Sequence, residues 1–210
     1  MIGRSKSPQF PVFSPQLKDT GLVTVDWGLW TDFMDEPIID LHSDDYFMRE
    51  ALRQAARADE GGEVPVGAVI VREGRIIARA FNQVEQLKDA TAHAEMLALT
   101  QAEEAVGDWR LMDCTLYVTK EPCPMCAGAM VHARLARVVF GASDPKGGAA
   151  GGAMNLLQFP TLNHHCEITG GIREADCRGL LQKFFARQRL SEKSEKKNSN
   201  DDPDSSGRVL

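Results

Sequence analysis

Apolar and polar positions after residue 43 follow the 3.6-residue period of an amphipathic helix. Ser43 is a suitable N-cap, and Asp44 and Asp45 occupy the first turn behind it. The apolar residues that recur at helical spacing are Phe47, Ala51, Leu52, Ala55 and Ala58. The pattern predicts a first helix that begins just after Ser43 and buries one face.

Two β-branched runs follow this helix. Residues 64–71 are almost continuously apolar, Glu73 and Gly74 suit a turn, and residues 75–81 run back to end at Asn82. A run without strict alternation is typical of a strand covered on both faces. We therefore expect a hairpin in a covered sheet.

The rest of the chain shows further helical and extended segments. The elements we expect are a helix from Ala92, a strand at 115–119, a helix from Cys123, a strand at 138–140, a strand closing at Ile168 and a helix at 174–190. Residues 141–163 are rich in glycine and contain Pro145 and Pro160, which predicts a long loop. Loops of this length are more often functional than idle.

Composition divides the chain into three parts. With 210 residues, 43% of them hydrophobic, it can bury one sizeable core, which we place at residues 37–190. Residues 1–36 contain scattered prolines without periodicity, which predicts a flexible extension. Residues 191–210 are almost free of apolar side chains, so we expect a disordered charged tail.

Charge and cysteine content restrict the class of protein. No uninterrupted apolar run approaches the length of about 18 residues that a membrane span needs. Five cysteines are an odd number, and no secretory apolar segment lies near the start, so we expect reduced thiols and a cytoplasmic location. The net charge of -6 opposes a strongly basic nucleic-acid-binding domain, and basic residues exceed acidic ones only within 141–190.

Two predicted helix starts carry residues that bind metals. Cys123 and Cys126 are three residues apart at one start, and His93 stands at the other. Zinc takes thiolate sulfur and imidazole nitrogen in tetrahedral geometry, and a catalytic site leaves one of the four positions open. Unpaired backbone N–H groups at a helix start favour thiolates. Together these residues predict a catalytic zinc ion with three protein ligands.

Glu95 is the expected proton carrier at this site. Two thiolates cancel much of the charge of zinc, so its water is acidified less than in an all-imidazole site, where the pKa is about 7. A neighbouring base is then needed to take a proton from water and return it to the leaving group. Hydrolytic removal of an amine from an aromatic ring uses this set of groups.

Other uses of the cysteine pair remain open. A C-x-x-C pair alone also fits a structural zinc or a redox pair. A structural zinc needs a fourth ligand, and Cys114, Cys166 and Cys177 are available. Cys114 begins a predicted strand and Cys177 lies in the last predicted helix, so both are more simply explained as core residues. A redox pair leaves the His-Ala-Glu run unexplained.

The two motifs together resemble those of the zinc-dependent nucleoside and nucleobase deaminases. Within that superfamily, residues 40–190 most resemble the bacterial-type tRNA-specific adenosine deaminases. The matching residues are 63–68, Asn82, 91–95, 116–119, 121–129, 138–142, Asp144, 146–151, Phe184 and Phe185. The resemblance implies a cytidine-deaminase-like three-layer α/β fold, a mixed central sheet covered by helices, and a homodimer.

The resemblance also implies roles for individual residues. His93, Cys123 and Cys126 bind one zinc ion per subunit, and Glu95 shuttles protons. The target nucleoside is contacted by Asn82, Val64 and Ala94, although Asn82 alone also fits an ordinary turn residue at a strand end.

The implied substrate is the wobble adenosine of a tRNA anticodon, which becomes inosine. Bases of an anticodon loop are single-stranded and can be turned into a pocket at low cost. We expect Asp144, Lys146 and Arg187 to contact the RNA, although a solvated surface also accounts for charged residues there.

Two other functions remain possible on the sequence. The metal motif also suits a deaminase of a free base or nucleoside, such as guanine or cytidine, but residues 146–151 resemble the RNA-acting branch. The second possible function is that of a non-catalytic zinc-binding subunit that binds RNA beside an active partner. Such a subunit does not need a proton carrier, so the presence of Glu95 argues against it.

Overall fold

The computed structural model describes residues 40–200 of the chain, with side chains up to residue 194. The predicted extension at residues 1–36 lies outside the described residues, as do residues 201–210 of the predicted tail. The described residues belong to one structural unit. The division of the chain into extension, domain and tail therefore stays a prediction.

Five strands form one mixed sheet in the order β2-β1-β3-β4-β5. The strands are β1 (Gly67–Arg72), β2 (Arg75–Phe81), β3 (Cys114–Lys120), β4 (Arg137–Ala142) and β5 (Glu167–Gly170). β1 pairs antiparallel with β2 and β3, whereas the β3–β4 and β4–β5 pairs are parallel. Parallel neighbours need a crossover connection, and α4 (Pro124–His132) provides it between β3 and β4.

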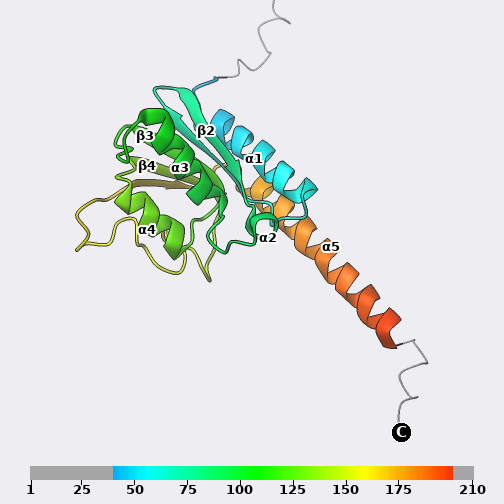
Figure 1. Ribbon diagram of the computed structural model, residues 1–210. Coiled ribbons are helices and arrows are strands. Elements are labelled where there is room, and N and C mark those ends of the chain that lie inside the picture. The colour runs from blue at the N-terminus through cyan, green and yellow to red at the C-terminus, as the bar shows by residue number, and fades with distance from the viewer. Residues whose placement is uncertain (1–39, 201–210) are drawn as a thin grey trace, which may run out of the picture. The chain divides into compact units, whose positions relative to one another are not determined.

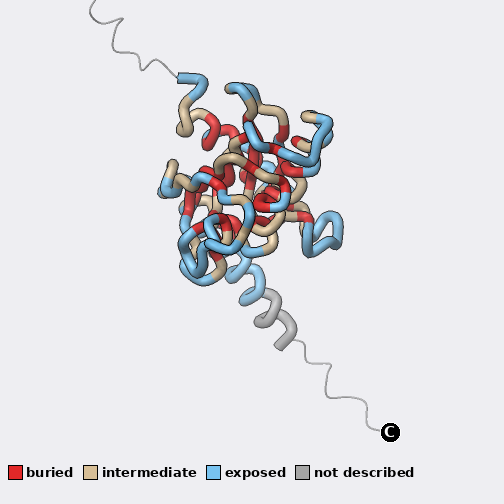
Figure 2. Tube along the Cα trace, turned by 90° about the vertical axis from the view of Figure 1, so that its left-hand side faces the viewer, coloured by how far each residue is buried: buried red, intermediate tan, exposed pale blue. Residues whose placement is uncertain are grey.

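Helices cover both faces of this sheet. Figure 1 shows α1 (Asp44–Glu60) and α5 (Glu174–Asn200) on one face and α3 (Ala94–Val106) with α4 on the other. Successive strand residues point to opposite faces, so Val69 packs with Phe47 of α1, whereas Ile70 packs with Leu99 of α3. Figure 2 shows the buried residues in the interior of the domain, and they come from the strands and from the helices that cover them. These layers confirm the predicted three-layer α/β fold.

An ionic contact fixes the start of α1 on the sheet. The guanidinium of Arg137 donates two hydrogen bonds of 2.8 Å to the carboxylate of Asp44. The hydroxyl of Tyr117 donates a third, also 2.8 Å long. The hydrogen bond from Arg137 is the largest influence on the Asp44 carboxyl and lowers its pKa.

Most predicted elements are present with shifted ends. The side chain of Ser43 caps α1 by accepting a hydrogen bond from the Tyr46 N–H, as predicted. β1 begins at Gly67 instead of residue 64, since Pro65 has no N–H to donate to a neighbouring strand. The short α2 (Val84–Leu87) was not predicted, because four residues are too few to show a helical period.

The last helix differs most from the prediction. We expected it to end at Leu190 with disorder beyond, but α5 continues to Asn200. Residues 191–200 contain neither glycine nor proline, so nothing in them stops the helix. Of the helices within residues 40–200, none has the length and apolar character needed to cross a bilayer.

Candidate active site

Two helix N-termini place the predicted metal ligands. His93 is the N-cap of α3 and Cys123 the N-cap of α4, both with extended backbone. Neither side chain makes the usual capping hydrogen bond to its own helix. Both are therefore free to turn away from their helices and toward each other.

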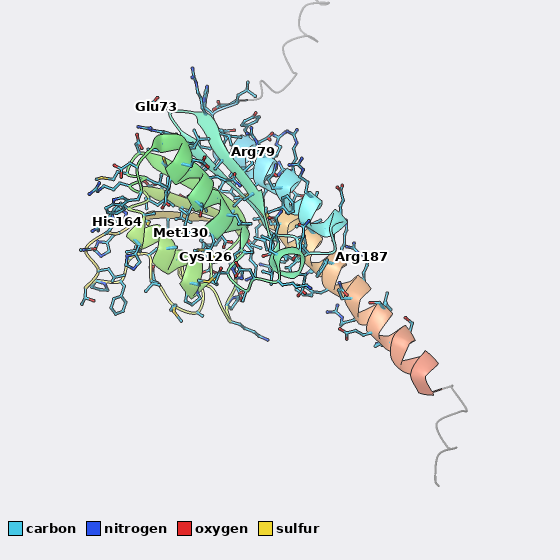
Figure 3. The ribbon with its side chains drawn as sticks, in the orientation of Figure 1. Glu73, Arg79, Cys126, Met130, His164 and Arg187 are labelled. Carbon is cyan, nitrogen blue, oxygen red and sulfur yellow. The ribbon has the colours of Figure 1, made fainter. Side chains whose placement is uncertain are left out.

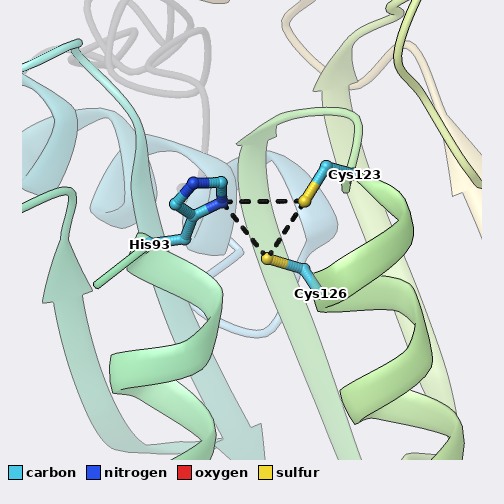
Figure 4. A group of neighbouring side chains, drawn as sticks. All are labelled: His93, Cys123 and Cys126. Atoms are coloured by element: carbon cyan, nitrogen blue, oxygen red, sulfur yellow. Dashed lines mark hydrogen bonds between the residues drawn. The ribbon is translucent and has the colours of Figure 1, made fainter. Parts of the chain in front are cut away.

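The three predicted ligands meet in a nearly equilateral triangle (Figure 4). His93 Nδ1 lies 3.6 Å from Cys123 Sγ and 3.5 Å from Cys126 Sγ, and the two sulfurs are 3.6 Å apart. Ligands on a tetrahedral zinc, with bonds of about 2.3 Å to sulfur and about 2.05 Å to nitrogen, lie roughly 3.8 Å (S–S) and 3.6 Å (S–N) apart. The donor set and its spacing therefore fit a zinc ion.

The remaining cysteines do not join this group. Among the described residues, the possible metal ligands that gather within 4.8 Å of one another are His93, Cys123 and Cys126. The structure describes all five cysteines as free thiols, and Cys114, Cys166 and Cys177 are buried in the two cores. A closed four-ligand site built from these thiols is therefore not formed.

The two thiols of the site differ in acidity. Their shared hydrogen bond lowers the pKa of Cys123 to about 5 and, together with burial, raises the pKa of Cys126. Cys123 is thus the more readily ionised of the two thiols, and Cys126 keeps its proton more tightly. Metal ligands must be deprotonated, so binding a dication would release the second proton.

Glu95 lies in the first turn of α3, two residues after His93. It is 4% exposed, and burial raises the pKa of its carboxyl. A carboxyl group with a raised pKa can hold and release a proton closer to neutral pH than an exposed one. This is the property required of a proton carrier.

A pocket of about 300 Å³ opens beside these groups. His93, Glu95 and Cys123 form one part of its wall, and Val64 and Asn82 form another. Its other lining residues are Glu63, Val66, Val84, Glu85, Lys120 and Glu121. Ala94 is buried between His93 and Glu95 and is not part of the lining. The pocket thus joins the metal-ligand triangle to two of the three predicted nucleoside contacts.

Glu63 was not predicted to have a role, yet it holds Asn82 in place. The Glu63 carboxylate is 2% exposed and accepts hydrogen bonds from Asn82 Nδ2 (3.1 Å) and the backbone N–H of Gln86 (2.7 Å). It therefore connects the end of β2 to the start of α2. A carboxylate beside a predicted strand was the available signal, but its partners are 19 and 23 residues away.

Glu121 was also missed as a site residue. Its carboxylate is 2% exposed and accepts backbone N–H groups of Asp144 (2.7 Å), Ala150 (3.0 Å) and Gly152 (2.7 Å). A Cβ atom at Gly148 would lie 2.2 Å from the Glu121 carboxyl carbon, so only glycine fits there. Glu121 thus ties the long loop to the segment that carries Cys123.

The three expected RNA contacts lie outside the pocket lining. The Asp144 carboxylate pairs with Lys120 and accepts the N–H of Lys146 at 3.0 Å, so it shapes the loop. The Lys146 residue is exposed. Arg187 pairs with Asp59 of α1 and lies on α5, away from Cys126 (Figure 3).

The fold and the site together define a deaminase with a cytidine-deaminase-like fold. The chain belongs to the MafB19-like deaminase family, whose profile matches residues 42–189. The predicted resemblance to the deaminase superfamily is thereby confirmed.

Individual relatives of the chain have more specific names than the family. The chain is 52% identical over 155 residues to the "tRNA-specific adenosine deaminase" of Bacillus subtilis (strain 168), covering 74% of this chain and 96% of that protein. The protein of the same name from Streptococcus pyogenes serotype M18 is 43% identical over 154 residues, or 73% of this chain and 97% of the relative. A structure solved in a study of A-to-I editing by tRNA:A34 deaminases at the wobble position superposes with a TM-score of 0.63. It is 45% identical and covers 65% of this chain and 99% of that one.

Proposed function

We propose that this protein deaminates adenosine to inosine at the wobble position of a tRNA anticodon. The observation that carries the proposal is the triangle of His93, Cys123 and Cys126, because His93 and Cys123 line the same pocket as the buried Glu95. Relatives named as tRNA-specific adenosine deaminases, at up to 52% identity among those compared, support the substrate.

Zinc is the proposed cofactor, one ion per chain, with His93, Cys123 and Cys126 as its ligands. When bound there, zinc supplies a Lewis acid that lowers the pKa of water. The triangle offers three side chains, which matches the three protein ligands of catalytic zinc sites rather than the four of structural ones.

Glu95 moves the proton in the proposed reaction. Its carboxylate takes one proton from the attacking water while the water oxygen bonds to C6 of adenine. The same carboxyl group delivers that proton to ring nitrogen N1, and then carries the second proton of the added oxygen to the amine, which leaves as ammonia and leaves the C6=O group of inosine. One water is consumed, and Glu95 ends the cycle in the state in which it began.

The pocket wall orients the nucleoside. Asn82 and Val64 line the pocket together with His93 and Cys123, and we assign both to contacts with the target nucleoside. Ala94, between the ligand and the proton carrier, contributes through its backbone, since its side chain is buried. The target base must leave the RNA stack to enter, which costs least in a single-stranded loop.

RNA contacts outside the pocket are proposed for Asp144, Lys146 and Arg187. Lys146 is exposed on the loop that Glu121 holds beside the pocket, so it can meet a phosphate directly. Asp144 acts through the loop shape, because its carboxylate is occupied by Lys120 and backbone N–H groups. Arg187 must share its guanidinium with Asp59.

A homodimer is proposed as the working assembly. A second hollow of about 350 Å³ is lined by Trp109, Leu156 and Leu162 among others, and Met154 and Phe159 nearby in the chain are half exposed. Clustered exposed apolar side chains favour a protein interface. Light scattering after gel filtration measures the assembly directly.

The cytoplasm is the proposed location. Five free thiols fit a reducing compartment, where disulfides are rare. The expected substrate, tRNA, is used there.

One assay tests the proposed function against its alternatives. Purified protein is incubated with unmodified tRNA that carries adenosine at the wobble position and, separately, with free adenosine, guanine and cytidine. Inosine in the tRNA, with no ammonia released from the free compounds, is the expected result. Ammonia from a free compound alone would indicate a nucleoside or base deaminase, and no product from any of them would indicate a non-catalytic subunit.

A further inference from the structure

Glu63 is a buried carboxylate in the pocket wall that takes part in none of the ion pairs between described residues. Burying a charge is costly unless hydrogen bonds compensate it. Its compensation comes from two donors, one on each oxygen. Oε2 accepts from Asn82 Nδ2, and Oε1 accepts from the backbone N–H of Gln86.

This arrangement fixes the orientation of the Asn82 amide. An ionised carboxylate only accepts hydrogen bonds, so the NH₂ end of Asn82 must face it. The amide is planar, and fixing Nδ2 therefore fixes Oδ1 as well. No group of the described residues donates a hydrogen bond to Oδ1. Among the same residues, the side-chain atoms that are both inaccessible and without a partner do not include Oδ1, so Oδ1 is accessible. It therefore has access to the pocket that Asn82 lines.

We propose that Glu63 is a positioning residue that determines the polarity of Asn82, so that Oδ1 accepts a hydrogen bond from the bound nucleoside. The inference rests on the proposed function and deepens it. The ligand must then present an O–H or N–H group at this part of the pocket.

Replacement of Glu63 by glutamine reverses this polarity while preserving the hydrogen bonds. The N–H of Gln86 belongs to the backbone and cannot become an acceptor, so the introduced glutamine must direct its carbonyl oxygen to it. The NH₂ group of the new side chain then faces Asn82, whose amide turns over to accept. The pocket now meets the NH₂ end of Asn82, and a donor on the nucleoside faces another donor.

The polarity can be restored by a second change. In the double variant Glu63→Gln with Asn82→Asp, the carboxylate at position 82 accepts from position 63 and still offers an oxygen to the pocket. The total charge of the pair is the same as in the wild-type protein. The single variant Asn82→Asp places two carboxylates against each other, so it should lose both stability and binding.

The experiment measures kcat, KM and melting temperature with an anticodon stem-loop RNA bearing adenosine at the wobble position. For Glu63→Gln we expect an unchanged melting temperature and a KM raised about tenfold, because an unpaired polar group in a desolvated site costs about that factor. The double variant should return KM to within a few-fold of wild type. Glu60→Gln, the same chemical change at an exposed position three residues away, is the control.

The outcomes separate the two proposals. No turnover by the wild-type protein on this RNA would remove the proposed function and this inference together. Turnover by the wild type with an unchanged KM in Glu63→Gln overturns the inference alone. So does a double variant that melts at the wild-type temperature while its KM stays raised, since a purely structural role for Glu63 predicts that result.

Discussion

The carboxylate of Glu121 accepts the backbone N–H of Gly152 at 2.7 Å across 31 residues of chain. The same buried carboxylate accepts two more N–H groups, from Asp144 and Ala150, and so closes the loop beside the pocket. The conformation of the segment that carries Lys146 therefore depends on Glu121 as well as on Asp144, whose carboxylate accepts the N–H of Lys146.

Glu121→Gln should loosen this loop. A glutamine oxygen can keep two of the donors, but its NH₂ group would face the third N–H and leave it unpaired. We expect a loss of about 1–3 kcal/mol in the free energy of unfolding, measured by urea denaturation, and faster amide hydrogen exchange at residues 144–152. Glu104→Gln, at an exposed helix position, is the control, and exchange no faster than in that control would contradict the role of Glu121.

Replacement of a metal ligand should abolish stoichiometric zinc. Changes to groups that merely orient a ligand weaken metal binding by about 10- to 100-fold, so Cys123→Ser or His93→Ala should weaken it by more than about 100-fold. Elemental analysis of the purified protein gives the zinc content per chain. Cys166→Ala removes a buried cysteine outside the triangle and should retain one zinc; a loss of zinc there would show that the ligand set is wrong.

Glu95→Gln should keep the metal and lose the reaction. The amide has nearly the shape of the carboxyl group but cannot carry a proton, so kcat should fall by about 10²- to 10⁴-fold. Zinc content and melting temperature are measured on the same preparation. Substantial residual deamination by a zinc-loaded variant would refute the proton-carrier role.

Lys146→Ala should weaken tRNA binding and reduce its dependence on salt. Each lost phosphate contact lowers the slope of log K against log salt by about 0.7 for a single-stranded segment. Arg187→Ala should have a smaller effect, because the Arg187 guanidinium already pairs with Asp59. Arg75→Ala, at the far end of the β1–β2 hairpin from Asn82, is the control, and an effect equal to that of Lys146→Ala would argue against a local contact.

The Asp44–Arg137 pair predicts how stability depends on pH. The folded-state pKa of Asp44 is lowered, chiefly by the hydrogen bond from Arg137. Between this pKa and the ordinary value of about 3.9 the unfolded chain binds the proton and the folded one does not, so the free energy of unfolding rises with pH there. The contribution of Asp44 to the free energy of unfolding is complete above the pKa of Asp44 in the unfolded chain. It is lost as the pH falls through the pKa of Asp44 in the folded protein.

Asp44→Asn should therefore flatten the acid limb of the stability profile between about pH 5 and pH 2. Urea unfolding at a series of pH values measures the slope. Asp108→Asn, an exposed carboxylate paired with the nearby Arg110, is the matched control. An acid limb as steep in Asp44→Asn as in wild type would exclude a contribution from this pair.

Local features of the sequence were sufficient for most of the fold. Ser43 predicted the start of α1 because an N-cap interacts only with its own helix. The turn at Glu73 and Gly74 predicted the β1–β2 hairpin because turn residues act on the strands directly beside them. The predicted end of α5 at Leu190 was wrong, because no residue from 191 to 200 stops a helix.

The sequence predicted those parts of the candidate site whose residues lie close together in short motifs. Cys123 and Cys126 are one helical turn apart, and His93 and Glu95 share another helix start, so their residue types alone indicated a metal and a proton carrier. The resemblance added Asn82. None of these signals depends on contacts between distant residues.

The sequence by itself thus determined most of the elements, the candidate ligand residues and the family, because each is contained in local patterns and short motifs. Only the tertiary structure decided that Glu63 orients Asn82, that Glu121 holds the loop, and that Arg187 is engaged by Asp59. These contacts join residues that are 19 to 128 positions apart. A hydrogen bond requires its atoms to meet within about 3 Å, and it is the packing of helices on the sheet that brings them together.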